Sequence, residues 1–336
     1  MEHKRENNNQ KIAAGVWVLL GAVLVIGLAF FLRTLKETQE AGAFSNDNGR
    51  ILAVNVKEEE MAAPLEKTIE GTVSDRPGSA DTGKSEEDYP DKCGLDRVER
   101  PRQRSRREVL ARLRELGEDN ELIADIVRNR SDYPDRVLEA LANNPEMADF
   151  VSHWNGLEQE ASGGVTDSEK KQEFPLFLQW DPRWGYVEYG DDSCIALSGC
   201  GPTCLSMVLY YLTDDERITP DRVGEYSMEN GYYISGTGTA WALMEAMAAE
   251  YGVACRQSAA AEDEMKEALD NGAVLILSMG PGEFTAAGHF IVVYGYDRDG
   301  FLVNDPNCVA RSRSRWSYSE LERQIKNMWV LSNVKC

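Results

Sequence analysis

The sequence is short of positive charge and of histidine. Its 336 residues include 57 Asp and Glu against 36 Lys and Arg, which leaves a formal net charge of −21. An acidic surface repels phosphate backbones, so nucleic acid is excluded as an expected partner. The three histidines are His3, His153 and His289, so any chemistry that needs an imidazole base has few candidates.

Long runs of residues without charge are also scarce, and the clearest one lies near the N-terminus. Ile12 to Leu32 carries no charge and would span about 31 Å as an α-helix, enough for the core of a bilayer. More basic residues precede the run than follow it closely, which favours a cytoplasmic N-terminus. We therefore predict a cytoplasmic segment at 1–11, a transmembrane signal anchor at 12–32, and a single-pass cell-membrane protein whose remainder is extracytoplasmic. A cleaved signal peptide is the alternative.

Residues 33–94 are acidic and poor in large apolar side chains, so we predict a disordered linker there. Within it, Gly78–Ser85 matches the phosphate-loop pattern G-x-x-x-x-G-K-S letter for letter. That pattern binds phosphate only between a buried strand and a helix. Proline and acidic residues flank it here, so we expect no nucleotide binding.

Residues 95–160 are predicted to form a small all-α subdomain. An arginine block at 97–107 precedes it, and we expect this block to be a solvated helix entry or to pair with acids; an anionic wall polymer or lipid is the alternative partner. Apolar residues then recur at helical spacing, as at Val109 and Leu113. His153 near the end is expected to be structural or exposed.

Residues 174–336 combine helical and strand patterns and predict an α+β domain with an antiparallel sheet. The predicted helices begin at Cys200, at Thr239 as an N-cap (239–251) and at Glu262 (262–269). The predicted strands are 273–278, 289–296, 301–304 and 328–331. Asp299-Gly300 predicts a hairpin turn rather than a calcium loop.

The second half of the chain is organised around Ser198–Leu209, which reads Ser-Gly-Cys-Gly-Pro-Thr-Cys-Leu-Ser-Met-Val-Leu. Small residues turn the chain before Cys200, and Pro202 suits the first turn of the helix that follows. A helix N-terminus lowers the pKa of a thiol, so Cys200 is a candidate nucleophile; a buried structural cysteine is the alternative. Cys204 lies one turn later and is expected in the core.

The chain has seven cysteines, so at least one is unpaired. If Cys200 is the free one, the other six allow 15 pairings, and the sequence does not choose among them. An extracytoplasmic location permits disulfides without requiring them.

A nucleophilic cysteine needs a base, and His289 is the best placed of the three histidines. It opens an apolar strand directly after a glycine-containing loop. Asp305, at the end of the next strand, could orient the imidazole, and Asn304 is the competing choice because an amide oxygen also accepts a hydrogen bond. Gln179, upstream of Cys200, is a candidate oxyanion donor together with the Cys200 backbone N–H.

The order Gln179, Cys200, His289, Asp305 resembles that of papain-like cysteine peptidases. One branch is matched by the stretches Gln-Trp-Asp-Pro-Arg-Trp-Gly, Gly-Cys-Gly-Pro-Thr-Cys-Leu-Ser-Met-Val-Leu, Gly-His-Phe-Ile-Val-Val-Tyr-Gly-Tyr-Asp and Asn-Asp-Pro. The branch is the standalone, secreted or membrane-anchored relatives of the bacteriocin-processing peptidases (family thirty-nine of the cysteine peptidases). The resemblance covers about 174–334. It implies a papain-like fold, a catalytic Cys200, a base His289, an orienting Asp305 and an oxyanion-hole Gln179.

Two further features bear on this resemblance. The helical stretch at 133–151 is similar to the region that precedes the domain in bacterial members. Transporter-linked members carry Asp before the nucleophile, where this chain has Gly199, and they also carry a membrane domain and an ATPase. Cleavage of double-glycine leaders is therefore not implied.

We predict a membrane-tethered, extracytoplasmic cysteine peptidase or amide hydrolase that acts on a peptide or protein through an acyl-enzyme, without cofactor or metal. The alternatives are a catalytically silent papain-like binding module at the cell surface and a peptidoglycan peptide hydrolase. Candidates for the lining of a substrate groove, or for the core, are Trp180, Trp184, Tyr232, Tyr233 and Trp241.

Overall fold

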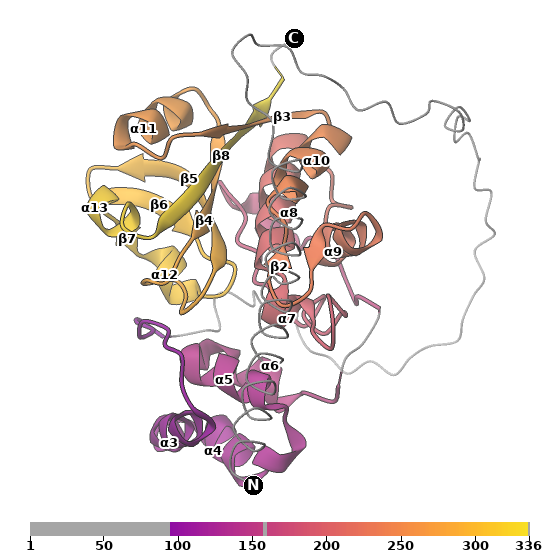
Figure 1. Ribbon diagram of the computed structural model, residues 1–336, viewed down its shortest axis with the longest axis vertical. Coiled ribbons are helices and arrows are strands. Elements are labelled where there is room, and N and C mark those ends of the chain that lie inside the picture. Colours follow the sequence, from indigo (N-terminus) through magenta and orange to yellow (C-terminus); the bar gives the residue numbers. More distant parts are fainter. Residues whose placement is uncertain (1–94, 157–159, 335–336) are drawn as a thin grey trace, which may run out of the picture. The chain divides into compact units, whose positions relative to one another are not determined.

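The computed structural model describes residues 95–156 and 160–334 (Figure 1). The chain divides into two compact units, and the described residues all lie in the second, Ala80–Cys336. The predicted signal anchor at 12–32, the linker at 33–94 and the phosphate-loop match at 78–85 lie outside the described residues. Within the described residues, none of the helices is both long and apolar enough to cross a bilayer.

Short helices make up the first described segment, as the sequence predicts. They are α3 (Arg106–Leu116), α4 (Glu121–Arg128), η1 (Arg130–Asp132), α5 (Asp135–Asn143), η2 (Pro145–Met147) and α6 (Ala148–Ser152). Helix α3 begins at a capping box formed by Ser105 and Glu108, and α4 begins where the Asn120 side chain accepts a hydrogen bond from the Ile123 N–H.

This helical segment shares its core with the C-terminal part of the chain. One buried cluster takes side chains from both, among them Leu113, Ile126, Leu138, Phe150, Leu178, Trp180, Cys194, Ala196 and Val309. The rings of Phe150 and Tyr186 stack with centroids 4.2 Å apart, and the Tyr186 hydroxyl donates to Phe150 O. The two parts therefore pack against each other over a continuous apolar contact.

The C-terminal part is built on a six-stranded antiparallel sheet with strand order β3-β8-β4-β5-β6-β7. The strands are β3 (Val253–Ser258), β4 (Val274–Met279), β5 (His289–Asp297), β6 (Gly300–Asn304), β7 (Arg315–Trp316) and β8 (Ile325–Asn333). Every residue of β4 is buried, because helices cover both faces of the sheet. Ile276 and Val292 belong to the core on one face, and Leu275 and Val293 to the core on the other.

Helices flank both faces of this sheet, with α8 and α10 on one side and α11 and α13 on the other (Figure 1). The elements are η3 (Glu169–Lys171), α7 (Ile195–Ser198), α8 (Cys200–Thr213), α9 (Pro220–Glu229), α10 (Ala242–Glu250), α11 (Glu262–Asp270), α12 (Val309–Arg313), α13 (Tyr318–Leu321) and the ribbon of β1 (Tyr233–Ile234) with β2 (Gly238–Thr239). Helix α8 packs against β5 and is buried from Gly201 to Tyr210. The mixed α/β architecture with an antiparallel sheet is as predicted.

One predicted helix start is wrong. The sequence predicts Thr239 as an N-cap, but α10 begins at Ala242 and Thr239 lies in β2 opposite Tyr233. Gly238 has a φ of +96°, which keeps the chain in the short ribbon, and the Thr239 hydroxyl bonds the Tyr189 hydroxyl at 2.8 Å instead of capping a helix. Helix α9 and strand β3 are not predicted from the sequence, because α9 is largely polar and the burial of β3 does not alternate.

Candidate active site

Cys200 is the first residue of α8, and a glycine stands on each side of it. A Cβ at Gly199 would lie 2.6 Å from Ile195 O, and a Cβ at Gly201 would lie 2.7 Å from Thr239 Oγ1. Real Cβ atoms essentially never come this close to another atom, so the backbone can pass here only with glycine. Cys200 itself is partly exposed, whereas the rest of the first turn is buried.

His289 begins β5, and its side chain is 8% exposed. Because α8 packs against β5, the imidazole lies beside the start of α8, close enough to the Cys200 sulfur to shift the pKa of the thiol. The backbone N–H groups of Phe290 and Gly201 also favour the ionised form of that thiol. The structure therefore brings together the cysteine and the histidine that the sequence singles out.

Asp305 follows the last residue of β6 and is fully buried. Strands β5 and β6 are neighbours, with Val292 opposite Asn304, so the residue after β6 lies close to the start of β5. His289 Nε2 and Asp305 Oδ1 are 2.7 Å apart. Since Nε2 is occupied by Asp305, Nδ1 is the ring nitrogen left for Cys200.

Helix α12 supplies two further partners of Asp305 that the sequence analysis missed. Arg311 Nη1 donates to Asp305 Oδ2 at 3.2 Å, and Ser312 Oγ accepts from the Asp305 N–H at 2.9 Å. The Asn307 N–H donates to Asp305 Oδ1 at 2.8 Å. The segment Val309–Arg313 is short and largely polar, so no apolar periodicity marks it as a helix.

These contacts shift the pKa values of all three groups. Burial alone would raise the pKa of the Cys200 thiol, but the hydrogen bond and charge of His289 outweigh burial and lower that pKa. Burial opposes the charged form of His289, yet the charge of Asp305 and its hydrogen bond raise the pKa of His289 to about 10. Burial would also raise the pKa of Asp305, but the charges of His289 and Arg311 lower it. Both the lowered pKa of Cys200 and the raised pKa of His289 favour the thiolate–imidazolium pair over the neutral pair.

Cys200 alone among the five described cysteines has a lowered pKa. Burial raises the pKa of Cys194 to about 11 and that of Cys204 well above its usual value. The cysteines with a raised pKa are Cys194, Cys204, Cys255 and Cys308. All five are free thiols, and the cysteines at 93 and 336 lie outside the described residues.

Gln179 connects the helix that precedes Cys200 with the loop that carries Asp305. Its Nε2 donates to Ala196 O at 2.7 Å, and its backbone N–H donates to Pro306 O at 2.7 Å. The residue is 5% exposed, and its Oε1 has no hydrogen-bond partner among the described residues. A side-chain amide carries two N–H groups, so one remains for an acceptor other than Ala196.

Asn304, the competing choice for the orienting residue, is directed elsewhere. Its Nδ2 donates to Pro175 O at 2.8 Å and lies 3.9 Å from Met207 Sδ. The contacts with His289 thus come from Asp305 and not from its neighbour.

The other candidate side chains lie apart from this site. His153 is exposed, and its Nδ1 bonds Asp149 O at 2.8 Å, as expected for a structural or exposed histidine. Trp180 and Trp184 are fully buried, so they belong to the core, which is one of the two alternatives that the sequence left open for them. Trp241 is 48% exposed and contacts the buried Trp329 edge to face.

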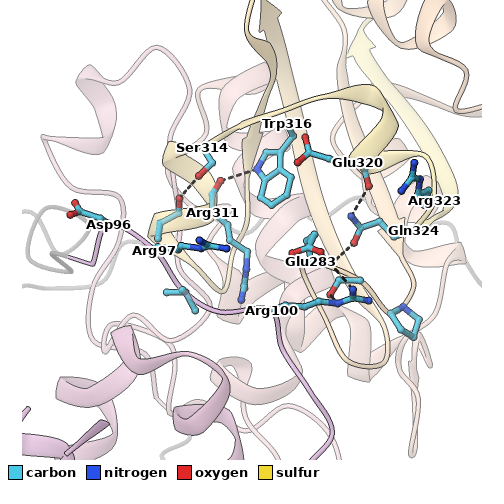
Figure 2. Close-up of a pocket in the computed structure, with 14 residues that line it drawn as sticks. Asp96, Arg97, Arg100, Glu283, Arg311, Ser314, Trp316, Glu320, Arg323 and Gln324 are labelled. Carbon is cyan, nitrogen blue, oxygen red and sulfur yellow. Dashed lines mark hydrogen bonds and ion pairs between the residues drawn. The ribbon is translucent and has the colours of Figure 1, made fainter. Parts of the chain in front are cut away.

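A cavity of about 590 Å³ adjoins Arg311 (Figure 2). It is lined by residues of the segment at 96–100, the loop at 281–283 and residues between 310 and 324. Figure 2 shows Arg97, Arg100 and Arg311 around it. Neither Cys200 nor His289 lines this cavity, so it is separate from the thiol and imidazole.

Comparisons with known proteins show which family the C-terminal part of the chain resembles. Residues 171–334 match the model of the Peptidase_C39 like family. The peptidase domain of Streptococcus ComA, a bi-functional ABC transporter involved in quorum sensing, matches with a TM-score of 0.33 and 19% sequence identity, covering 41% of this chain and 93% of that one. A protein from Bacillus anthracis described as C39-like peptidase has a TM-score of 0.30 and 13% identity, covering 52% of this chain and 100% of that one. No curated protein matches the chain. The part of the chain that carries Gln179, Cys200, His289 and Asp305 is therefore similar to the Peptidase_C39 like family.

Proposed function

We propose that the domain at 174–336 is a membrane-tethered, extracytoplasmic cysteine peptidase or related amide hydrolase with a Cys200–His289–Asp305 triad. The observation that carries the proposal is the 2.7 Å contact between His289 Nε2 and Asp305 Oδ1, with the imidazole beside Cys200 at the start of α8, where it lowers the pKa of the thiol. The family match of 171–334 supports a peptide or protein as the substrate. The uncharged run at 12–32 is the proposed tether, with the N-terminus in the cytoplasm.

In the proposed reaction, the Cys200 thiolate attacks the carbonyl carbon of the scissile amide and a C–S bond forms. The His289 imidazolium gives its proton to the leaving amine as the C–N bond breaks, which leaves an acyl-enzyme. Water then attacks the acyl carbon while His289 takes a proton from it, and the thiolate leaves. Asp305 keeps the imidazole in the orientation that serves both steps.

The carbonyl oxygen becomes negatively charged during each attack and needs donors. The Cys200 backbone N–H lies at the start of α8. Gln179 Nε2 donates to Ala196 O in α7, and Gly199 alone separates the end of α7 from Cys200. We assign both as oxyanion donors, because fixed N–H groups stabilise a charge that develops only in the transition state.

Two alternatives from other classes remain open to test. A papain-like binding module would keep the fold without turnover. A peptidoglycan peptide hydrolase would share the order of cysteine and histidine but cleave only wall peptides. The lowered pKa of Cys200 favours turnover over binding alone, because a structural cysteine does not need an ionised thiol.

The test uses the purified full chain in detergent, with Cys200→Ala and, as a matched control, Cys204→Ala from the next turn of α8. We expect the wild type and Cys204→Ala to react rapidly with iodoacetamide at Cys200 and pH 6 and to cleave fluorescence-quenched casein, and Cys200→Ala to do neither. Rapid alkylation with cleavage of purified wall peptides alone would select the peptidoglycan hydrolase. Slow alkylation of Cys200 and Cys204 at equal rates would overturn the enzyme and leave the binding module.

A further inference from the structure

A residue of the helical segment at 95–156 binds the first N–H groups of α12, which belongs to the domain at 174–336. The Glu146 carboxylate accepts from the Val309 N–H at 2.8 Å through Oε2 and from the Ala310 N–H at 2.9 Å through Oε1. Glu146 lies in η2 and is 6% exposed. The first N–H groups of a helix have no acceptor inside the helix, so one buried side chain here satisfies two of them.

A neighbouring residue of the same turn holds the loop just before α12. Asn144 Nδ2 donates to Asn307 O, and Asn144 Oδ1 accepts from the Glu146 N–H at 3.1 Å. Asn144 is fully buried. The backbone at Asn307, Val309 and Ala310 is thus bound by Glu146 of η2 and by Asn144, the N-cap residue of η2.

Helix α12 in turn carries the groups that hold Asp305. Arg311 is 4% exposed and donates to the Asp305 carboxylate, and Ser312 Oγ accepts from the Asp305 backbone N–H. Arg311 Nη2 also donates to Glu99 O at 3.1 Å, so the segment before α3 contacts the same guanidinium. A shift of the first turn of α12 would therefore move both partners of Asp305 together.

Helix α12 depends on its contacts, because five residues are too few for a helix to be stable alone. Burial raises the pKa of the Glu146 carboxyl, and the hydrogen bonds from the Ala310 and Val309 N–H groups oppose part of this rise because they favour the ionised form. Removing the carboxylate would leave two buried N–H groups without an acceptor at the end that Asp305 adjoins.

We propose that Glu146 is a positioning residue for Asp305, acting through α12, so that the helical segment at 95–156 completes the active site of the family domain. This inference rests on the proposed role of Asp305 in orienting His289. The helical segment at 95–156 thus contributes to catalysis by the domain at 174–336, because it keeps Asp305 in position.

The experiment measures the rate at which iodoacetamide alkylates Cys200 in the full chain from pH 5 to pH 10. The variants are Glu146→Gln and Glu146→Ala, with Glu108→Gln as the matched control, since Glu108 also caps a helix of the same segment but lies on α3. When Asp305 moves away from His289, the imidazolium of His289 is less stable. The fraction of Cys200 that is thiolate at low pH then falls. We expect alkylation about tenfold slower at pH 6 in both Glu146 variants, unchanged rates at pH 10, and wild-type rates in Glu108→Gln.

Labelling of the buried cysteines separates this effect from loss of fold. If Glu146→Ala also exposes Cys204 and Cys308 to iodoacetamide, Glu146→Gln decides, because it keeps the side-chain shape. An alkylation profile of Glu146→Gln that superimposes on the wild type, with Cys308 protected, overturns the proposal.

The route through Asp305 is tested by the double variant Glu146→Gln/Asp305→Asn. If Glu146 acts only through Asp305, the double variant alkylates at the rate of Asp305→Asn alone; effects that multiply would mean a separate structural role and overturn the inference. An Asp305→Asn profile equal to the wild type would overturn both this inference and the proposed triad. A shifted Asp305→Asn profile with an unshifted Glu146→Gln profile would overturn this inference only.

Discussion

Asn304 and Asp305 are consecutive residues whose side chains serve different parts of the domain. Asn304 donates to Pro175 O at 2.8 Å, whereas Asp305 lies 2.7 Å from His289 Nε2. Successive side chains of an extended segment point in opposite directions, so only one of the two can face the histidine. The end of β6 thus presents a carboxylate, and not an amide, to the imidazole.

The first prediction concerns this pair. Asp305→Asn keeps an acceptor of similar shape but removes the charge that stabilises the imidazolium, so turnover should fall roughly 100-fold or more. Asn304→Ala leaves the contact of His289 with Asp305 in place and should reduce turnover far less. Both are measured as initial rates of casein hydrolysis on folded protein. A larger loss in Asn304→Ala would transfer the orienting role to Asn304.

A second prediction follows from the pKa directions of the Cys200–His289 pair. The pKa of Cys200 is lowered and that of His289 is raised to about 10. Turnover needs thiolate and imidazolium together, so it should rise with pH below the usual range of a thiol and fall only as pH passes about 10. Alkylation needs the thiolate alone and should not fall there. A decline in turnover near pH 6.5, the ordinary pKa of histidine, would mean that Asp305 does not stabilise the imidazolium.

The sequence is informative about the site where the signal is local. Cys200 is marked by two glycines and a proline at a helix start, and His289 by its place at the start of an apolar strand; both expectations need only neighbouring residues. The choice between Asp305 and Asn304 needs the register of β5 against β6, and this pairing contains an irregularity between Val293 and Gly295. That irregularity cannot be read from the alternation of side chains.

Contacts distant in the sequence could not be predicted. Glu146 reaches Val309 across 163 residues, and nothing near Glu146 distinguishes it from the other acids of a polar helical stretch. Thr239 looks like an N-cap because its residue type favours one, but its hydroxyl bonds Tyr189 in the folded chain. In both cases tertiary packing, and not local preference, decides where the polar group is used.

A third prediction concerns the glycines beside the nucleophile. Gly201→Ala would place a methyl group 2.7 Å from Thr239 Oγ1, so the start of α8 must move and the free energy of unfolding should fall by about 1–3 kcal/mol. Gly288→Ala is the matched control, because a Cβ there meets no atom within 4 Å although His289 is next to it. Chemical denaturation with tryptophan fluorescence measures both. Equal free energies of unfolding for the two variants would show that the ribbon of β1 and β2, which contains Thr239, moves aside without loss of stability.

A fourth prediction addresses topology. If 12–32 is a signal anchor with the N-terminus in the cytoplasm, proteinase added to intact cells should digest the domain at 174–336 without lysis. A cytoplasmic protein with its own antibody serves as the control for intact cells. Complete protection of the domain until lysis would place it on the cytoplasmic side.

The last prediction separates Gln179 from the triad. Gln179→Ala removes a side-chain N–H from the oxyanion site, and loss of one such donor should lower turnover about 100- to 1,000-fold. Alkylation of Cys200 by iodoacetamide forms no oxyanion, so its rate at pH 6 should stay at the wild-type value. The backbone bond from Gln179 to Pro306 O survives the substitution, which keeps the loop of Asp305 attached. Gln179→Glu should behave in the same way, because an ionised carboxylate can accept but not donate. Alkylation that falls together with turnover in both variants would instead assign Gln179 a structural role, through its side-chain bond to Ala196 O and the start of α8.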